Sequence, residues 1–510
     1  MKKSYLIGVP TFLLMMALAF YIVSSDNVHS ENTQDDEASL ELGVDVLLNE
    51  RLDELDGKSV GLITNPTGVD QELNSIVDML YEDDGIDLVA LYGPEHGVRG
   101  GAQAGEDVDY YIDERTGLPV YSLYGDTRKP TPEMLEGVDV LLFDIQDVGA
   151  RFYTYIYTMA YAMEAAEEND IEMIVLDRPN PISGGNVEGP VLDEEYASFV
   201  GMYAIPQQHG MTVGELAELF NDEFDIGADL DVIEMNGWER TMHYDDTTLP
   251  WVMPSPNMPT LDTAIVYPGA ALFEGTNISE GRGTAKPFEL IGAPFITGED
   301  LADELSEMGL EGVEFRAAYF TPQFSKHEGE LSGGIEIYVT DRSSYDSVKT
   351  GLTIVKTIHD MYPDDFEFRE EDDAGISFFD QLIGNGWVRD MIEEGDSVDD
   401  IVVEWQSDLD DFKELRRDYL IYTTHSEEIQ ELVDDLEESG DIKDGDTAHD
   451  LTLHLTAIGQ FEENGKADKV VKHTNGFKTL VDYQKEEDLI TVAAQEKLKQ
   501  KADALLTQWE

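Results

Sequence analysis

The sequence predicts an α/β protein with a parallel-sheet domain, a smaller α/β region after it, and an all-helical module at the C-terminal end. Three observations predict this order. From about residue 40, short and almost continuously apolar segments alternate with amphipathic helical stretches. A segment rich in Pro and Gly begins near Trp251, and after Tyr422 the pattern becomes amphipathic helices separated by glycine-containing breaks. Apolar strands that alternate with helices are typical of a parallel sheet covered on both faces.

The expected elements follow from this periodicity. In the first domain they are strands at 60–64, 86–91, within 138–149 and within 171–181, with helices at 71–81 and 154–169. In the second region they are a helix at 298–308, the strand-like runs VEFRAAYF and GGIEIYVTD, a helix ending at 361, and a helical stretch over 388–422. The segment 427–510 is expected to form three or four helices.

Polar side chains follow the expected strands of the first domain where each strand ends. They are Asn65, the turn YGPEHGVRGG (92–101) with Glu95, His96 and Arg99, then Asp144, Gln146 and Asp147, and then Asp177, Arg178 and Asn180. In open α/β sheets the ligand crevice lies at the carboxyl ends of the strands. The sequence therefore predicts a site at this edge, with Glu95 as a possible proton donor. Taken alone, Glu95 and His96 could equally form a salt bridge or a cap near a turn.

A second glycine-rich loop offers two more carboxylates. Glu274 and Glu280 flank GTNIS, and Arg282 follows closely. In a chain with 109 acidic residues, a single glutamate is most often a solvated surface group. The surrounding glycines, however, let the backbone approach a ligand closely, and Asn277 and Thr284 add neutral hydrogen-bonding groups. Two carboxyl groups facing one crevice are what cleavage of a glycosidic bond requires.

Other polar residues have more than one interpretation. Asp144, Asp147 and Asp177 could hold Mg²⁺ or Ca²⁺, although hydrogen bonding to loop amides is the commoner role. Arg151 and Arg178 could pair with these aspartates or with a substrate carboxylate. His209 precedes an expected helix start and could be structural or contact substrate. Three alternating tyrosines, at 153, 155 and 157, are expected to pack in the core or at the rim of a site.

Composition narrows the class of protein. The formal net charge is −77, which repels nucleic acid and anionic lipid and favours a folded surface adapted to high salt. The absence of cysteine excludes disulfides, Cys-ligated zinc, thiol catalysis and a lipidated N-terminal Cys. Residues 1–25 resemble a signal peptide, and the apolar run 5–23 could instead be an uncleaved membrane anchor. With 26–39 as an acidic linker, the remainder is expected to be secreted or associated with the cell surface.

Nine blocks of the sequence, in order, resemble those of the exo-β-N-acetylmuramidases, the NamZ-like or DUF1343 family. They are LITNPTGVD, LYGPEHGVRG, FDIQDVGARFYTYIYTM, VLDRPNPISGGNVEGPVL, PQQHGMTVGELA, WVMPSPNMPTLDTAIVYPG, LFEGTNISEGRGT, PFELIGAP and FDQLIG. The resemblance implies a Rossmann-like domain over 40–265, a second α/β domain over 266–424, and an active site between them. The segment 427–510 is similar to FIMAH-type helical modules, which implies attachment or assembly rather than chemistry.

The resemblance also implies hydrolysis of the terminal, non-reducing N-acetylmuramic acid from peptidoglycan fragments, without a metal or organic cofactor. It places the catalytic carboxyl groups on Glu95, favoured as general acid, and on Glu274, with Glu280 in reserve. Arg282, Arg151 and Arg178 are the candidates to bind the lactyl carboxylate of the sugar. The expected substrate contacts are Asn65, His96, Arg99, Asp144, Gln146, Arg151, Asp177, Arg178, Asn180, His209, Asn257, Asn277, Arg282 and Thr284.

Three alternatives remain at this stage. Asn257 or Asn277 could orient the 2-acetamido group for substrate-assisted catalysis. The protein could bind muropeptides without turning them over. It could also be a metal-dependent hydrolase that uses Asp144 and Asp177.

Overall fold

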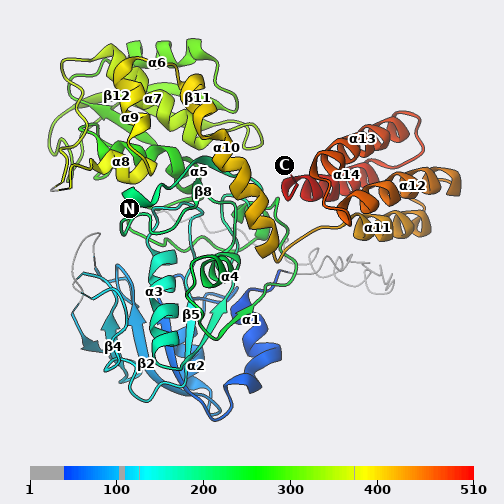
Figure 1. Cartoon of the computed structure of the whole chain (residues 1–510), viewed down its shortest axis with the longest axis horizontal. Coiled ribbons are helices and arrows are strands. Elements are labelled where there is room, and N and C mark those ends of the chain that lie inside the picture. The colour runs from blue at the N-terminus through cyan, green and yellow to red at the C-terminus, as the bar shows by residue number, and fades with distance from the viewer. Residues whose placement is uncertain (1–39, 103–108, 126, 373, 510) are drawn as a thin grey trace, which may run out of the picture. The chain divides into compact units, whose positions relative to one another are not determined.

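A seven-stranded sheet forms the centre of the first domain (Figure 1). The computed structural model describes residues 40–102, 109–125, 127–372 and 374–509. The strand order is β3-β4-β2-β1-β5-β6-β9, and every neighbouring pair is parallel except β3 and β4. The strands are β1 (Ser59–Thr64), β2 (Asp87–Gly93), β3 (Tyr111–Ile112), β4 (Pro119–Ser122), β5 (Val140–Asp144), β6 (Glu172–Leu176) and β9 (Leu230–Ile233).

Successive residues of β5 pack into two different cores, which explains why this strand is apolar throughout. Leu141 and Phe143 belong to one core with residues of α3 (Tyr155–Glu168) and α4 (Val213–Glu223). Val140 and Leu142 belong to the other core, with residues of α1 (Gly43–Val46), η1 (Leu47–Arg51) and α2 (Ile76–Glu82). Side chains alternate across a strand, so helices cover both faces of the sheet. The predicted parallel sheet is confirmed.

The second region contains a three-stranded antiparallel sheet in the order β10-β12-β11. Its elements are α5 (Leu261–Ala270), η5 (Ala271–Gly275), β10 (Leu290–Ala293), α6 (Gly298–Met308), β11 (Val313–Phe320), β12 (Ser332–Val339), α7 (Ser347–Met361) and α8 (Phe378–Ile383). The expected helix 298–308 and the two expected strands are confirmed. The helix α5 was not predicted, because it contains Pro268 and Gly269 and follows the proline-rich segment 250–259.

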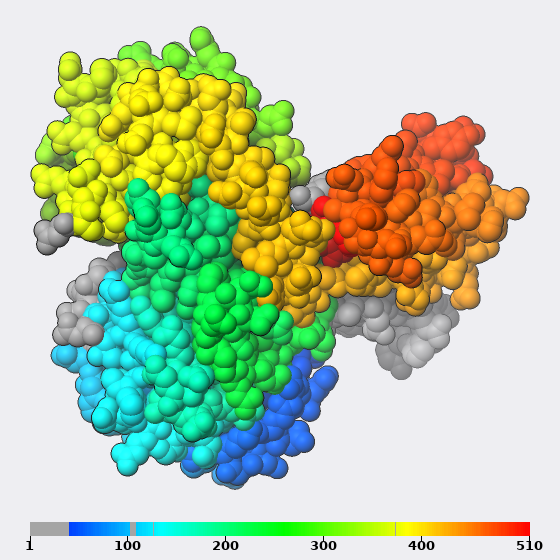
Figure 2. Space-filling view, in the orientation of Figure 1, coloured from blue at the N-terminus to red at the C-terminus, as the bar shows by residue number. Residues whose placement is uncertain are grey.

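The helical stretch expected over 388–422 is interrupted. Gly395 has a φ of 89° and ends α9 (Trp387–Glu394), so that α10 (Val398–Arg416) starts as a new helix capped by Ser397. A left-handed glycine at this position is a common way to end a helix. The helix α10 packs against α7 of the second region and against β7 (Glu188–Val191), and Figures 1 and 2 show it crossing between these two regions.

Four helices with a hydrophobic core of their own follow α10 and the short turn η6 (Arg417–Tyr419). They are α11 (Ser426–Ser439), α12 (Gly445–Glu462), α13 (Ala467–Glu486) and α14 (Val492–Thr507). Across the described residues, no helix combines the length and apolarity needed to span a bilayer. The predicted signal peptide or anchor at 1–25, its apolar run 5–23 and the linker 26–39 lie outside the described residues.

A pair of carboxyl groups joins β7 to the start of α7. Glu188 accepts hydrogen bonds from the backbone N–H groups of Ser347 (2.8 Å) and Val348 (3.4 Å), and its carboxyl group also contacts that of Asp346. Burial raises the pKa of both carboxyl groups, and the Asp346 carboxylate raises that of Glu188 further. The contact therefore favours a state in which at least one carboxyl group holds a proton.

We expect Glu188→Gln to reduce the loss of folding stability that occurs as the pH becomes alkaline. A carboxyl group whose pKa is raised in the folded state contributes stability below its unfolded pKa, and this contribution is lost as pH rises through the folded pKa. The glutamine amide oxygen can still accept the two N–H groups but carries no charge. Thermal unfolding from pH 5 to pH 9 tests this: the melting temperature of the wild type should fall more than that of the variant. Parallel decreases would contradict the expectation.

Candidate active site

Loops of both domains enclose one cavity of about 610 Å³. The first domain contributes the loop after β2, the segment before α3 and the segment around Phe199, whereas the second contributes η5 and its following loop, α5 and α8. The lining residues with ionisable acidic or basic side chains are Glu95, His96, Arg128, Glu274 and Arg282. The remaining lining residues are Tyr124, Phe152, Tyr153, Thr154, Tyr155, Ser198, Phe199, Val200, Ser255, Tyr267, Phe378, Gln381 and Leu382. The two glutamates favoured from the sequence thus face the same cavity.

A tight turn after β2 positions Glu95. His96 and Gly97 both have positive φ, 75° and 72°, and the N–H of Gly97 donates to the carbonyl of Pro94 at 2.9 Å. Positive φ is uncommon for a residue other than glycine, and His96 is held in this conformation by a 3.1 Å contact from Nδ1 to the carbonyl of Ala102. At Gly93 a Cβ atom would lie only 2.8 Å from the Val98 nitrogen, so only glycine fits. The sequence YGPEHG therefore holds Glu95 in a fixed pose at the cavity.

Glu274 lies in η5, directly after α5, and is held by charged neighbours. Arg282 donates to Glu274 at 3.1 Å and forms an ion pair with Glu280 at 3.3 Å. Lys326 donates to Glu280 at 2.9 Å and also to the carbonyls of Phe273 (2.6 Å) and Ile278 (2.9 Å). The loop between β11 and β12 thus fixes the loop that carries Glu274.

The pKa of Glu274 lies above its ordinary value. Burial is the largest cause, the Arg282 guanidinium opposes it, and the nearby Glu280 carboxylate raises the pKa further. Glu280 itself is 2% exposed and does not line the cavity. The structure therefore places this reserve candidate behind Arg282, where its charge acts on the site through its neighbours.

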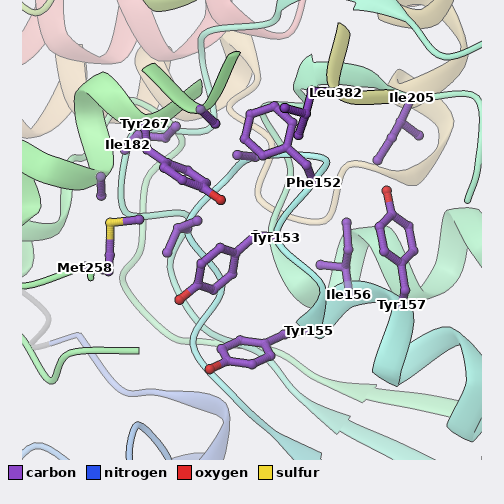
Figure 3. Close-up of a cluster of buried hydrophobic side chains, with 14 of the residues drawn as sticks. Phe152, Tyr153, Tyr155, Ile156, Tyr157, Ile182, Ile205, Met258, Tyr267 and Leu382 are labelled. Carbon is purple, nitrogen blue, oxygen red and sulfur yellow. The ribbon is translucent and has the colours of Figure 1, made fainter. Parts of the chain in front are cut away.

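Three tyrosine side chains form an aromatic wall of the cavity. Tyr153 packs edge-on against both Tyr155 and Tyr267, with ring centroids 5.0 and 5.8 Å apart. Burial raises the pKa of all three hydroxyl groups, and the negative charge of Glu95 adds to the effect in each case. Figure 3 shows the hydroxyl groups of Tyr153 and Tyr155 pointing to the same side, whereas Tyr157 points toward Ile205. The Tyr155 hydroxyl donates to the carbonyl of Pro254 at 2.5 Å, and the Tyr153 hydroxyl oxygen is buried, so these side chains present mainly aromatic surface to the cavity.

Most polar groups at the strand ends do not reach the cavity, because they bind one another. Arg178 forms a bidentate ion pair with Asp144, with N–O distances of 2.5 and 2.8 Å, and the pair is almost fully buried. Asp177 accepts hydrogen bonds from Thr212 (2.7 Å), Gly214 (2.8 Å) and Tyr422 (2.7 Å). Burial raises the pKa of Asp177 to about 7. The expected pairing of Arg178 with an aspartate is confirmed.

Arg151 differs from the expectation, since it pairs with neither an aspartate nor the cavity. Its guanidinium group is fully buried and donates to the carbonyls of Pro190 (2.9 Å), Ile205 (3.0 Å) and Leu382 (2.8 Å). It therefore joins the first domain to α8. An arginine can satisfy several carbonyl oxygens at once because its planar group carries five donors.

The other expected contact residues also have partners within the protein. The Asn65 side chain accepts a hydrogen bond from the backbone N–H of Thr67. The Gln146 amide donates to the carbonyls of Asp147 and Pro179, and the Asn180 amide donates to the carbonyl of Met211. The His209 ring lies 3.5 Å from the Asp147 carboxylate. Arg99 pairs with Asp78 and Asp113, Asn277 donates to the carbonyl of Asp365, and Thr284 donates to that of Gly281. Asn257 is buried. Of the predicted substrate contacts, His96 and Arg282 line the cavity.

The geometry gives no support to a metal site on Asp144 and Asp177, because protein donors already bind both carboxylates. Within the described residues, no three His, Asp or Glu side chains are grouped as metal ligands would be. Sequence reasoning missed several lining residues, among them Arg128, Tyr124, Phe199 and Gln381. A usable signal was the arginine in YGDTRKP, in the loop that follows the strand 119–122 of the same sheet.

Comparison with known proteins places the chain in a family. The sequence models of the N-terminal and C-terminal domains of the exo-β-N-acetylmuramidase NamZ match residues 60–262 and 265–422, and that of the FIMAH domain matches 426–507. The peptidoglycan β-N-acetylmuramidase NamZ of Bacillus subtilis (strain 168) is 58% identical over 408 residues, which are 80% of this chain and 97% of that protein.

Two crystal structures of DUF1343 family proteins from Bacteroides fragilis are also similar. One is 41% identical, with a TM-score of 0.70, and the match covers 75% of this chain and 99% of the other. The second is 32% identical, with a TM-score of 0.61, covering 76% and 99%. The matches in sequence and fold along both NamZ domains show that the chain belongs to the exo-β-N-acetylmuramidase NamZ family, with a FIMAH domain at its C-terminal end.

Proposed function

We propose that the protein is an exo-acting glycoside hydrolase that removes the terminal, non-reducing N-acetylmuramic acid from peptidoglycan fragments. The observation that carries the proposal is that Glu95 and Glu274, from different domains, line one cavity walled by tyrosine rings. A pair of carboxyl groups with an aromatic wall is suited to bind a sugar and to cleave its glycosidic bond. The similarity to a Bacillus subtilis enzyme named as a peptidoglycan β-N-acetylmuramidase supports the choice of sugar.

In the proposed mechanism Glu95 donates a proton to the leaving oxygen, and Glu274 acts on the anomeric carbon as base or nucleophile. Arg282 keeps the second carboxyl group oriented through its 3.1 Å hydrogen bond. Because the pKa of Glu274 is raised, the rate should fall on the acidic side as this group gains a proton, at a pH above the ordinary range of a glutamate.

The direct test is incubation of the purified protein with the disaccharide in which N-acetylmuramic acid is β-linked to N-acetylglucosamine. Chromatography with mass spectrometry should detect both free sugars. A chain with an N-acetylglucosamine residue added to the non-reducing end should be resistant. Binding of the disaccharide without release of either sugar would instead support a muropeptide-binding protein.

The proposal extends to the place of action. A secreted or cell-surface location agrees with the peptidoglycan substrate and with the N-terminal sequence MKKSYLIGVPTFLLMMALAF. We also propose attachment or assembly as the role of the FIMAH helices. Fractionation of cells that produce the full chain, followed by immunodetection, tests the location, and a cytoplasmic protein would contradict it.

Salt dependence is a second expected property. A net charge of −77 gives strong repulsion within the folded state, and salt reduces it because the screening length falls from about 10 Å at 0.1 M to about 3 Å at 1 M. We expect the melting temperature to rise steeply between these two concentrations. Differential scanning calorimetry measures it, and an equal melting temperature in dilute buffer would contradict adaptation to salt.

A further inference from the structure

The substrate carries a negative charge that the cavity must accept. N-acetylmuramic acid differs from N-acetylglucosamine by a lactyl ether whose carboxyl group is ionised at neutral pH. The protein has a net charge of −77, and two glutamates line the cavity. An anionic sugar is therefore repelled unless a cationic group faces its carboxylate.

Among the described residues that line the cavity, three can carry positive charge: His96, Arg128 and Arg282. His96 uses Nδ1 to contact the carbonyl of Ala102 at 3.1 Å and is 4% exposed. Arg282 is bound between Glu274 and Glu280 and compensates both carboxylates. Arg282 cannot bind a further carboxylate without breaking an existing contact. His96 has only Nε2 left, on an almost fully buried ring, and one ring N–H cannot form the two parallel hydrogen bonds of a bidentate pair.

Arg128 differs from these two groups. Its guanidinium carbon lies 3.9 Å from the ring centroid of Phe199, and in the described part of the chain no carboxylate pairs with it. Phe199 is itself fixed, because it stacks on Tyr161 of α3 with centroids 6.4 Å apart and an interplanar angle of 17°, and it also contacts Tyr124. Stacking on a fixed ring restrains the guanidinium plane while leaving the N–H groups at its edge free.

A planar guanidinium held in this way can bind a carboxylate through two parallel hydrogen bonds, which a lysine cannot reproduce. We propose that Arg128, supported by Phe199, binds the lactyl carboxylate and is the residue that makes the site specific for N-acetylmuramic acid. The inference rests on the proposed function. It replaces Arg151 and Arg178 in this role, since both are buried and bind other protein groups.

The test compares two chromogenic substrates: 4-nitrophenyl N-acetyl-β-muramide with a free lactyl carboxylate, and the same compound as its lactyl methyl ester. The wild type should prefer the free acid in kcat/KM. In Arg128→Gln, kcat/KM for the acid should fall by about tenfold to a hundredfold, the range of a lost hydrogen bond to a charged group, with little change for the ester. Arg128→Lys should keep part of the preference. The ratio of acid to ester within one variant does not depend on how much of the sample is folded.

Arg417→Gln is the matched control. Arg417 also lies over an aromatic ring, that of Trp509 at 5.2 Å, but does not line the cavity, so its removal should leave the ratio unchanged. An Arg128→Gln variant with the wild-type ratio would overturn the proposal. A loss of the ratio in Arg369→Gln, with none in Arg128→Gln, would assign the role to Arg369, whose guanidinium lies 5.1 Å from the ring of Phe378.

Binding separates this inference from the proposed function. If the wild type releases no 4-nitrophenol from either substrate, the hydrolase proposal fails. Calorimetric titration of free N-acetylmuramic acid and of its methyl ester then tests Arg128 by itself. A preference for the acid that disappears in Arg128→Gln supports the role, and equal preferences in the two proteins contradict it.

Discussion

Glu95→Gln should lower the release of N-acetylmuramic acid from the disaccharide by about 10²–10⁴-fold, the usual contribution of a general acid. The glutamine is nearly the same size and can occupy the same pose in the YGPEHG turn, but it has no proton to donate. The loss should be much smaller on the 4-nitrophenyl muramide, because 4-nitrophenolate leaves without needing a proton. Steady-state kinetics on the two substrates measure this difference directly.

Glu274→Gln should behave differently. If Glu274 acts at the anomeric carbon, its loss should slow both substrates by similar factors, whatever the leaving group. Glu314→Gln, which alters an exposed glutamate of β11, is the matched control and should retain full activity. Equal losses on both substrates for Glu95→Gln, with a leaving-group dependence for Glu274→Gln, would reverse the two roles. Full activity in either variant would remove that residue from the mechanism.

The second large effect is expected in stability. Arg178→Met should lower the free energy of unfolding by about 3–5 kcal/mol, the usual cost of removing one partner of a buried ion pair. Asp144 is fully buried, so the variant must either bury an unpaired charge or protonate this group. Denaturant unfolding at high salt, followed by tryptophan fluorescence, measures the loss.

The double variant Asp144→Leu/Arg178→Met distinguishes a structural pair from a substrate contact. Removing both charges together should restore most of the lost stability, because no uncompensated group remains. If kcat/KM of this variant also stays near the wild-type value, the pair acts in the fold alone. A stable double variant that no longer binds the sugar would return Arg178 to the site.

The sequence predicted the four central strands of the first domain, β2, β1, β5 and β6, because their signals are local, but it did not predict the outer strands β3, β4 and β9. The five residues VLLFD of β5 are apolar without interruption, and a strand covered on both faces has no solvent-exposed side on which a polar residue would be stable. Local signals failed where a single residue changed the outcome. Gly395 ends α9 within an otherwise helical pattern, and Pro268 lies inside α5 although proline usually argues against a helix.

For the site, the sequence indicated the two glycine-rich loops, but it did not indicate which partners most of the nearby polar groups bind. Asp177 receives a hydrogen bond from Tyr422, 245 residues away, and Arg151 donates to the carbonyl of Leu382, 231 residues away. No local sequence pattern predicts hydrogen-bond partners that are so distant in the chain. Arg128 was missed because no motif surrounds it in the sequence. It becomes a candidate only when other segments of the chain form the cavity that it lines.

The sequence by itself determined the alternation of elements, the family blocks and the turn that presents Glu95. The tertiary structure decided which charged groups at the sheet edge face the cavity and which are buried in pairs. The physical reason is desolvation: a charge at that edge is stable only if it remains in contact with solvent in the cavity or finds an opposite charge or hydrogen-bond donors. Those partners come from distant parts of the chain, so only the folded protein brings them together.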